Sequence, residues 1–335
     1  RPPSWAARED KVRIDAFWEA ARIRHSPSLI VAAERDALGA AARKLDRGSG
    51  TVWTGDARDG IHGGAIVTFW VNDGAAAELA TARISSRCDR ARVMPFLEGI
   101  PCSIHGIVLP RAIIAFRPVE LLTLRRPGAD RFLYAGTATF WDPTDTDREE
   151  MRRIARQVGE CLRSQVGFRG LFTVDGVMTE EGFLPTELNP RPGAGLQGLT
   201  TAIPELPFAL LAIAVQAGEA LDFRPEVLES LVVVAADARR GGGIRTFFSG
   251  ERERTEIHGL VDDSGRYRLA RCGEASTASL VTGPSNLGGF LAFAPSGRGI
   301  ARGPSVAPRA IDAFRVAEES LGVALGPLEP ARSIR

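Results

Sequence analysis

The spacing of hydrophobic residues changes along the chain between the helical and the strand period, which predicts a fold of mixed helices and sheets. In the N-terminal part, apolar positions three and four residues apart predict helices over residues 10–24 and 35–45. Short apolar runs bounded by polar, glycine or proline residues predict strands at 29–32, 51–54 and 65–71. The last two of these strands flank a glycine-rich loop at residues 55–64.

The middle of the chain is predicted to contain a series of strands followed by one long helix. The strands are expected at 93–97, 102–108, 112–117, 120–125 and 132–139. Apolar residues then recur at helical spacing from Met151 to Leu162, after a capping box at Thr146–Glu149. We expect this amphipathic helix to end near Gly167.

Two further strands form a predicted hairpin, at residues 171–178 and 183–189. Its register sets Asp175 opposite Glu187, with Cβ atoms about 5 Å apart, where two carboxylates repel each other unless a cation lies between them. Glu187 and Asn189 share one face because strand side chains alternate. Two carboxylates and an amide oxygen are ligands that suit Mg²⁺, and the planar fork of Arg191 suits a phosphate or carboxylate beside it. A solvated hairpin with its acids in water is the alternative.

The C-terminal third changes character near Leu221, where we expect a domain boundary. Before it, residues 208–218 predict an apolar helix of small residues. After it, we expect Arg- and Gly-rich strands, one of them at the apolar run 231–236, closed by a helix at 309–321. The order of elements indicates an α+β fold, and no repeat of solenoid length is visible.

Composition narrows the class of protein. The 335 residues predict two or three domains, and 44% hydrophobic with 25% charged residues is the globular average. The formal net charge of +1 argues against a nucleic-acid or anionic-membrane partner. The longest apolar runs fall far short of the roughly 20 residues of a membrane-spanning helix, so we expect a cytoplasmic protein. The start at Arg1 indicates that the numbering begins inside a longer gene product.

The cysteines and lysines are also informative. Cys88, Cys102, Cys161 and Cys272 lie far apart with no CxxC pair, which favours reduced packing residues over disulfides or a zinc site. Lys11 and Lys44 are the only lysines among the 42 basic residues. Arginine is therefore the default cation of this chain, and a retained lysine is a candidate for chemistry.

The sequence Glu-Leu-Asn-Pro-Arg at 187–191, following an Asp-bearing strand and a long amphipathic helix, resembles the metal-binding hairpin of the ATP-grasp ligases. The resemblance covers about residues 10–218 and implies an ATP-grasp fold, in which two α+β subdomains clasp ATP, here with a smaller C-terminal α/β domain. The implied domains are a small subdomain with the glycine-rich loop at 1–94, a large subdomain with the metal hairpin at 95–220, and a C-terminal substrate or lid domain at 221–335.

The resemblance also implies roles for individual residues. A lysine after Asp10 would reach a nucleotide phosphate, and residues 93–99 would be the hinge between the subdomains, whose extended backbone binds the adenine edge. The glycine-rich loop would close over the phosphates with its backbone N–H groups. The implied ATP-binding residues are Lys11, Met94, Phe96, Leu97, Arg58, Gly60, Gly63 and Gly64. Asp175, Glu187 and Asn189 would bind Mg²⁺, and Arg191 would be catalytic.

One departure from the family pattern concerns the strand before the glycine-rich loop. Members commonly carry a second lysine there, whereas this chain has Trp53 and Thr54. Arg58 is a candidate substitute, and Lys44 lies too far back. Softer candidates for the cleft are Ser103 and His105, and the softer candidates for substrate contacts are Arg117, Glu120, Arg239 and Arg240, each of which is equally typical of a surface or packing residue.

The resemblance implies an ATP-dependent ligase that transfers the γ-phosphate to a substrate carboxylate and lets an amine attack the acyl phosphate, forming an amide. The C-terminal segment and the residues 175–195 are also similar to the peptide ligases of actinobacterial peptide antibiotics such as pheganomycin. The expected partners are small-molecule or peptide carboxylates and amines, with a homodimer left open. The alternatives are an enzyme like the biotin-dependent carboxylases, with Arg191 on bicarbonate, and a nucleotide-binding regulatory protein without catalysis.

Overall fold

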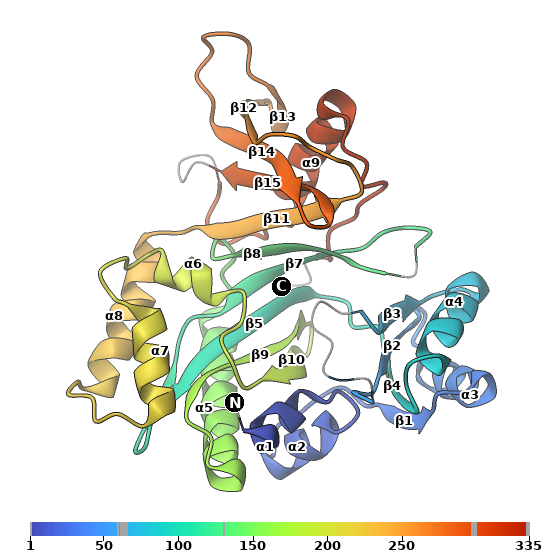
Figure 1. Ribbon diagram of the computed structural model, residues 1–335, viewed down its shortest axis with the longest axis vertical. Coiled ribbons are helices and arrows are strands. Elements are labelled where there is room, and N and C mark those ends of the chain that lie inside the picture. The colour runs from blue at the N-terminus through green and yellow to red at the C-terminus, as the bar shows by residue number, and fades with distance from the viewer. Residues whose placement is uncertain (1, 59, 61–65, 130, 296–299, 333–335) are drawn as a thin grey trace.

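The computed structural model describes residues 2–58, 60, 66–129, 131–295 and 300–332. Within these ranges the strands form two sheets, one of four and one of eleven strands, and their pairings are antiparallel. In Figure 1 the smaller sheet stands at the right, and the larger one runs from the centre into the module at the top. This arrangement confirms the expected mixture of helices and sheets.

The smaller sheet has the strand order β1-β4-β2-β3. Its strands are β1 (Leu29–Ala32), β2 (Thr51–Gly55), β3 (Thr68–Val71) and β4 (Arg90–Pro95). Two helices, α3 (Arg35–Leu45) and α4 (Gly74–Ser85), pack on one face, where they bury an apolar core that includes Leu38, Trp53 and Phe69. The other face of this sheet therefore remains for the cavity described below.

Helix α4 is one of the elements that the hydrophobic pattern does not predict. It is rich in alanine, so its buried and exposed faces differ little in hydrophobicity, although Ala80 and Ile84 are fully buried. The Asp73 side chain caps it by accepting a hydrogen bond of 2.8 Å from the backbone N–H of Ala76. The strand expected at 65–71 begins at Thr68, and Ala65 lies outside the described residues.

The N-terminal helix is shorter than the predicted 10–24. A short helix α1 (Pro3–Ala6) and a 3₁₀ turn (Ala7–Glu9) come first, and α2 spans only Ile14–Ala20. Asp10 accepts a hydrogen bond from the N–H of Val12 in the turn before α2, and the positive φ of Arg22 ends it. In Figure 1 both helices lie beside α5 (Asp145–Val166), and their side chains share its apolar core.

The larger sheet has the order β10-β9-β5-β7-β8-β11-β15-β14-β12-β13, with β6 paired to β5. Its first half comprises β5 (Ile100–Val108), β6 (Ile113–Ala115), β7 (Val119–Leu124), β8 (Leu133–Ala138), β9 (Gly170–Thr179) and β10 (Gly182–Asn189). Helix α5 covers one face. It ends at Gly167, as predicted, but its N-cap is Thr144, whose hydroxyl accepts from the N–H of Asp147, two residues before the predicted capping box.

Three helices cover one end of the opposite face, and Figure 1 places them at the left: α6 (Leu196–Thr200), α7 (Phe208–Ala217) and α8 (Pro225–Ala238). The apolar run 231–236, expected as a strand, belongs to α8. Val232 and Ala236 are buried one helical turn apart, whereas Leu231 and Val234 are exposed. A short apolar run does not by itself distinguish a helix from a strand.

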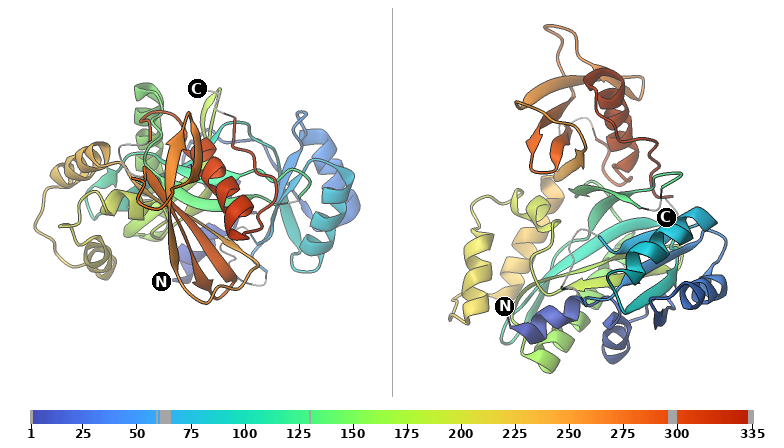
Figure 2. Two further views of the ribbon diagram at one scale, coloured as in Figure 1. Left: turned by 90° about the horizontal axis from the view of Figure 1, so that it is seen from above. Right: turned by 45° about the vertical axis from the view of Figure 1, so that its right-hand side comes forward.

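The C-terminal module continues the larger sheet, because β11 (Gly242–Phe248) pairs with β8. The remaining elements are β12 (Glu256–Asp263), β13 (Arg266–Leu269), β14 (Ala278–Ser285), β15 (Gly288–Pro295) and α9 (Ala307–Leu321). Figure 2 shows α9 beside the strands of this module, with which it shares an apolar core. The domain boundaries after residues 94 and 220 stay a prediction.

Two further expectations concern the whole chain. The four cysteines are unpaired, and three are buried as predicted, whereas Cys272 is exposed.

Among the described residues, none of the helices combines the length and the hydropathy of a membrane span.

Candidate functional site

A cavity of about 520 Å³ lies between the two sheets. The smaller sheet lines it with β2, β3 and β4, and the larger sheet with the face that α5 leaves uncovered. Nine of the candidate residues named from the sequence line this cavity: Lys11, Met94, Phe96, Leu97, Ser103, Asp175, Glu187, Asn189 and Arg191.

The β9–β10 hairpin brings the two acids together as predicted, since Asp175 and Glu187 are direct partners. The route to this register is different from the expected one. The sequence predicts a three-residue loop at 180–182. In the structure Gly182 pairs with Thr179, which leaves a two-residue turn, and a bulge at Thr186 restores the pairing further along.

A chain of polar contacts runs along this hairpin. The Asn189 amide donates to Asp175 Oδ2 over 3.0 Å, and its Oδ1 accepts from the Arg191 guanidinium over 3.0 Å. The Lys11 Nζ lies 3.1 Å from Glu187 Oε2. The N-terminal segment therefore supplies the cation that faces the second acid.

The electrostatic environment of Asp175 favours a positive ligand. Burial is the main cause that raises the pKa of this carboxyl to about 8, and the neighbouring Glu187 raises it further. Lys11, Arg191 and the Asn189 hydrogen bond act in the opposite direction but do not compensate. A bound cation would remove this penalty.

The donor set fits a hard divalent cation. Among the described residues, no group of three or more His, Cys, Asp or Glu side chains is arranged to hold a metal. A cation between Asp175 and Glu187 would thus be bound by two carboxylates, the Asn189 amide oxygen and oxygens of its own ligand or water. That set is typical of Mg²⁺, which keeps several non-protein oxygens.

Arg191 lies where β10 ends, at the edge of the cavity. Its Nε is 3.3 Å from the carboxylate of Glu9, which is buried in the 3₁₀ turn. The sequence analysis did not single out Glu9. Its position directly before Asp10 and Lys11 in the chain is the signal that could have found it.

The opposite end of the cavity is apolar. Met94 and Val52 are partners in the smaller sheet and both line the cavity, together with Leu97 of the hinge. Phe132, from the loop between β7 and β8, stacks on Trp70 of β3 at a ring distance of 5.8 Å. The two subdomains are therefore joined by an aromatic contact at this end as well as by the hinge.

Arg92 is a buried cation of the cavity that the sequence analysis missed. It is the direct partner of Thr54 in the β2–β4 ladder and occupies the same face. Asp15 of α2 holds its Nε and one terminal nitrogen at 3.0 and 2.7 Å, and the other terminal nitrogen donates to the Met94 sulfur at 3.2 Å. The signal that could have found Arg92 is its position two residues before Met94, because alternate residues of a strand lie on the same face.

The glycine-rich loop is described only in part. Gly63 and Gly64 lie outside the described residues, and Gly60 is exposed with a positive φ of 102°. The guanidinium of Arg58 is 3.0 Å from the Asp89 carboxylate and donates to the Ser86 carbonyl. The structure does not place Arg58 among the residues that line the cavity.

Ser103 lines the cavity, whereas His105 lies beneath its floor. The His105 ring contacts the hydroxyls of Ser103 and Thr173 at 3.3 and 2.9 Å, and burial lowers its pKa to about 3. A Cβ atom at Gly195 would come within 2.5 Å of the ring. The loop after Arg191 therefore packs directly on a neutral imidazole.

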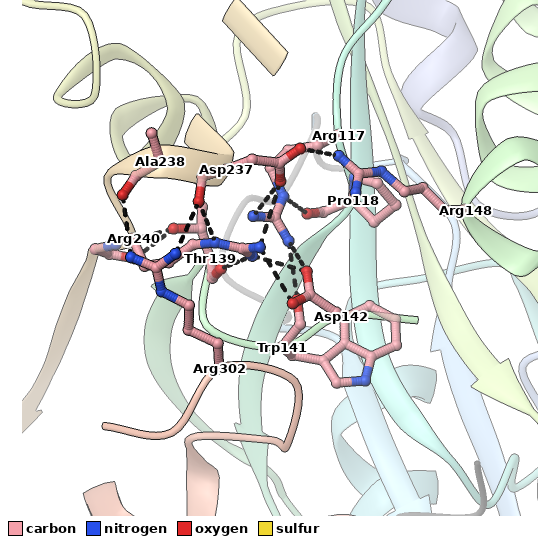
Figure 3. Close-up of polar contacts among 11 residues, drawn as sticks. Arg117, Pro118, Thr139, Trp141, Asp142, Arg148, Asp237, Ala238, Arg240 and Arg302 are labelled. Carbon is pink, nitrogen blue, oxygen red and sulfur yellow. Dashed lines mark hydrogen bonds and ion pairs between the residues drawn. The ribbon is translucent and has the colours of Figure 1, made fainter. Parts of the chain in front are cut away.

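Arg117 and Arg240 come together outside the cavity, in a cluster of charges at the junction of the larger sheet and α8 (Figure 3). Asp142 lies 2.7 Å from both guanidinium groups, and Asp237 lies 3.1 Å from Arg117 and also pairs with Arg148. Burial is the main cause that lowers the pKa of Arg117 to about 10. Two carboxylates thus pair with three arginines, and one terminal nitrogen of Arg117 makes an ion pair with Asp237 but has no hydrogen-bond partner among the described residues.

The remaining two substrate candidates, Arg239 and Glu120, are not among the residues that line the cavity. Arg239 is exposed at the end of α8. Glu120 is buried, and it accepts hydrogen bonds from the Ser305 hydroxyl and from the N–H of Val306 at the start of α9. Burial raises its pKa to about 7. The role of all four residues as substrate contacts stays a prediction.

The sequence and the fold were compared with known proteins. The family model described as "ATP-grasp domain" matches residues 60–195. No curated protein matches the chain.

Three solved structures illustrate the likeness of the fold. Carboxyaminoimidazole ribonucleotide synthase from Aspergillus clavatus, solved with ATP, is 11% identical with a TM-score of 0.58, over 93% of this chain and 74% of that chain. The biotin carboxylase domain of the Hydrogenobacter thermophilus 2-oxoglutarate carboxylase, solved with MgADP, ADP and bicarbonate, is 13% identical with a TM-score of 0.54, over 97% and 67%. Biotin carboxylase from Campylobacter jejuni is 14% identical with a TM-score of 0.54, over 97% and 68%. The expected ATP-grasp fold is confirmed.

Proposed function

We propose that this chain is an ATP-dependent ligase that activates a carboxylate as an acyl phosphate and joins it to an amine. The observation that carries the proposal is the juxtaposition, in one cavity, of the Asp175, Glu187 and Asn189 oxygens with the Arg191 guanidinium. The ATP-grasp domain match at residues 60–195 and the structural neighbours solved with ATP or ADP support the nucleotide. The proposal includes peptide-type substrates and a cytoplasmic location.

The two ends of the cavity suggest how ATP lies in it. The apolar end, between Val52, Met94 and Leu97, suits the adenine base. The phosphates would then extend toward Lys11 and Arg92, two cations that also line the cavity. Arg92 supplies positive charge opposite Thr54, where the family pattern has a lysine.

Asp175, Glu187 and Asn189 would hold Mg²⁺, which neutralises charge that develops on the phosphates during phosphoryl transfer. Arg191 would bind the carboxylate and the oxygens of the acyl phosphate with its planar fork. The contacts of Arg191 with Glu9 and Asn189 orient that fork toward the metal side of the cavity. The neutral His105 beneath the following loop holds that loop without adding charge.

The test measures phosphate release from Mg·ATP with panels of amino acids, short peptides and bicarbonate. We expect release to require a carboxylate acceptor, and hydroxylamine to trap the activated acid as a hydroxamate. Release with bicarbonate and no other acid would favour the carboxylase alternative. ATP binding without release under any condition would favour the regulatory alternative.

Glu187→Gln should lower phosphate release at least 100-fold, because it removes one of the two charges that would hold the metal. Glu181→Gln is the matched control, since Glu181 lies in the turn of the same hairpin and pairs with Arg24 at the surface. Near-wild-type turnover in Glu187→Gln would contradict the metal assignment.

A further inference from the structure

The last part of the chain returns from the C-terminal module to the cavity, and we call residues 323–332 the strap. Val323 and Leu325 at its start are buried in the core of the module. Ala331 near its end lines the cavity. A segment more than 200 positions away from the hinge in the sequence thus contributes to the same cavity as Leu97.

Arg125, at the end of β7, holds the strap in place. Its backbone and that of Glu329 exchange two hydrogen bonds, of 2.9 and 3.0 Å, in an antiparallel bridge. Its guanidinium also contacts the Glu329 carboxylate and the Pro330 carbonyl, both at 3.3 Å. Arg126 adds a bond of 2.9 Å to the Leu325 carbonyl.

The same arginine reaches the hinge. One terminal nitrogen of Arg125 is 3.8 Å from the carboxylate of Glu98, which in turn accepts from the Ser49 hydroxyl at 3.1 Å. The Nε of Arg125 is buried and has no hydrogen-bond partner among the described residues. Arg125, Ala331 and Leu97 all line the cavity, so the strap and the hinge border it together, joined through Arg125 and Glu98.

We propose that the strap, held by Arg125, is the outer wall of the pocket for the nucleotide base. The inference rests on the proposed function, which seats the base at the apolar end of the cavity. If the strap contacts the bound base, the docked strap strengthens nucleotide binding by a certain factor. The bound nucleotide then strengthens docking of the strap by the same factor, because the coupling free energy between two sites is reciprocal. A strap that only stabilises the C-terminal module would leave nucleotide affinity unchanged.

The first test places a large side chain in the wall. Ala331→Trp should raise the Kd for Mg·ATP at least tenfold in a calorimetric titration, because the indole would occupy space that the base needs. Ala324→Trp is the matched control, since Ala324 is exposed on the same strap, and its Kd should stay within twofold of wild type. ADP should be weakened by the same factor as ATP, because both carry the same base.

The second test removes the wall. A chain that stops after Leu328 keeps Val323 and Leu325 in the core and loses the bridge to Arg125, so ATP should bind several-fold more weakly. In the wild type, hydrogen exchange over residues 326–332 should slow at saturating Mg·ATP. Equal affinity in all variants, with unchanged exchange, would overturn the strap inference and leave the proposed function standing. Failure of the wild type to bind ATP would overturn both.

Discussion

At the scale of single residues, the raised pKa of Asp175 is the main electrostatic property of the site. Its folded-state pKa of about 8 lies above its usual value of 3.8, because the carboxyl is buried beside Glu187. The protonated form therefore stabilises the fold. This contribution is fully present below about pH 4 and is lost as the pH rises through about 8.

Metal binding at Asp175 should consequently depend on pH. Mg²⁺ must displace the proton, so its affinity should fall about tenfold for each pH unit below 8, with about one proton released per ion. Thermal shift with increasing Mg²⁺ at pH 6.5 and 8.5 measures this difference. Asp175→Asn should abolish the pH dependence, and equal Mg²⁺ affinity at both pH values in the wild type would contradict the assignment.

The two lysines provide a second comparison at this scale. Lys11→Met should raise the Kd for ATP about tenfold or more, because Lys11 lines the cavity 3.1 Å from Glu187, where we place the phosphates. Lys44→Met removes the same charge from the exposed face of α3 and should leave the Kd unchanged. Calorimetric titration of ATP measures both Kd values. An equal loss of ATP affinity in the two variants would mean that the resemblance of Asp10 and Lys11 to the family pattern is accidental.

At the scale of elements, α5 shows that helix caps depend on the geometry of individual residues. The hydroxyl of Thr144 accepts from the N–H of Asp147, whereas Thr146, the predicted cap, lies exposed inside the helix. Both threonines fit a capping sequence, since each is followed three residues later by an acid.

Substitution separates these two threonines. Thr144→Ala should lower the free energy of unfolding by about 1 kcal/mol, because it leaves an N–H of the first turn unpaired. Thr146→Ala should be neutral or slightly stabilising, since alanine is the better helix former. Urea unfolding followed by circular dichroism gives both values, and the reverse order would support the originally predicted cap.

At the scale of the whole molecule, the charge cluster around Arg117 joins parts of the chain that are distant in sequence. Asp142 follows β8, and Asp237 lies in α8, about 95 positions later. Both contact the buried guanidinium of Arg117. The cluster therefore ties α8 to the larger sheet, next to the strand pair through which the C-terminal module continues that sheet.

Arg117→Met should lower the free energy of unfolding by about 2 kcal/mol or more, because it removes the hydrogen bonds of a fully buried guanidinium to Asp142 and to the Trp141 carbonyl. Arg239→Met, a change of the same kind at an exposed position nearby, should cost less than about 0.5 kcal/mol. Chemical unfolding of both variants measures the difference, and equal stabilities would mean that the other arginines compensate for the loss.

The sequence by itself determined the local elements and the hydrophobic faces they present. The strands at 29–32 and 51–54 and the helix at 35–45 follow from periodicity, which involves residues close together in the chain. The Asp175–Glu187 pairing was predicted correctly, but a two-residue turn and a bulge produce it in place of the expected three-residue loop. Prediction failed for α4 and for the run 231–236, since alanine-rich and short apolar segments have little contrast between their faces.

Only the tertiary structure decided which distant residues meet. Arg92 faces Thr54 because β4 lies between β1 and β2, an order that strand patterns do not encode. The strap reaches Arg125 because β11 pairs with β8, so that the C-terminal module continues the larger sheet and its last segment returns to the end of β7. Such contacts depend on how the whole chain packs, and the periodicity of a single segment carries no information about its partners across the fold.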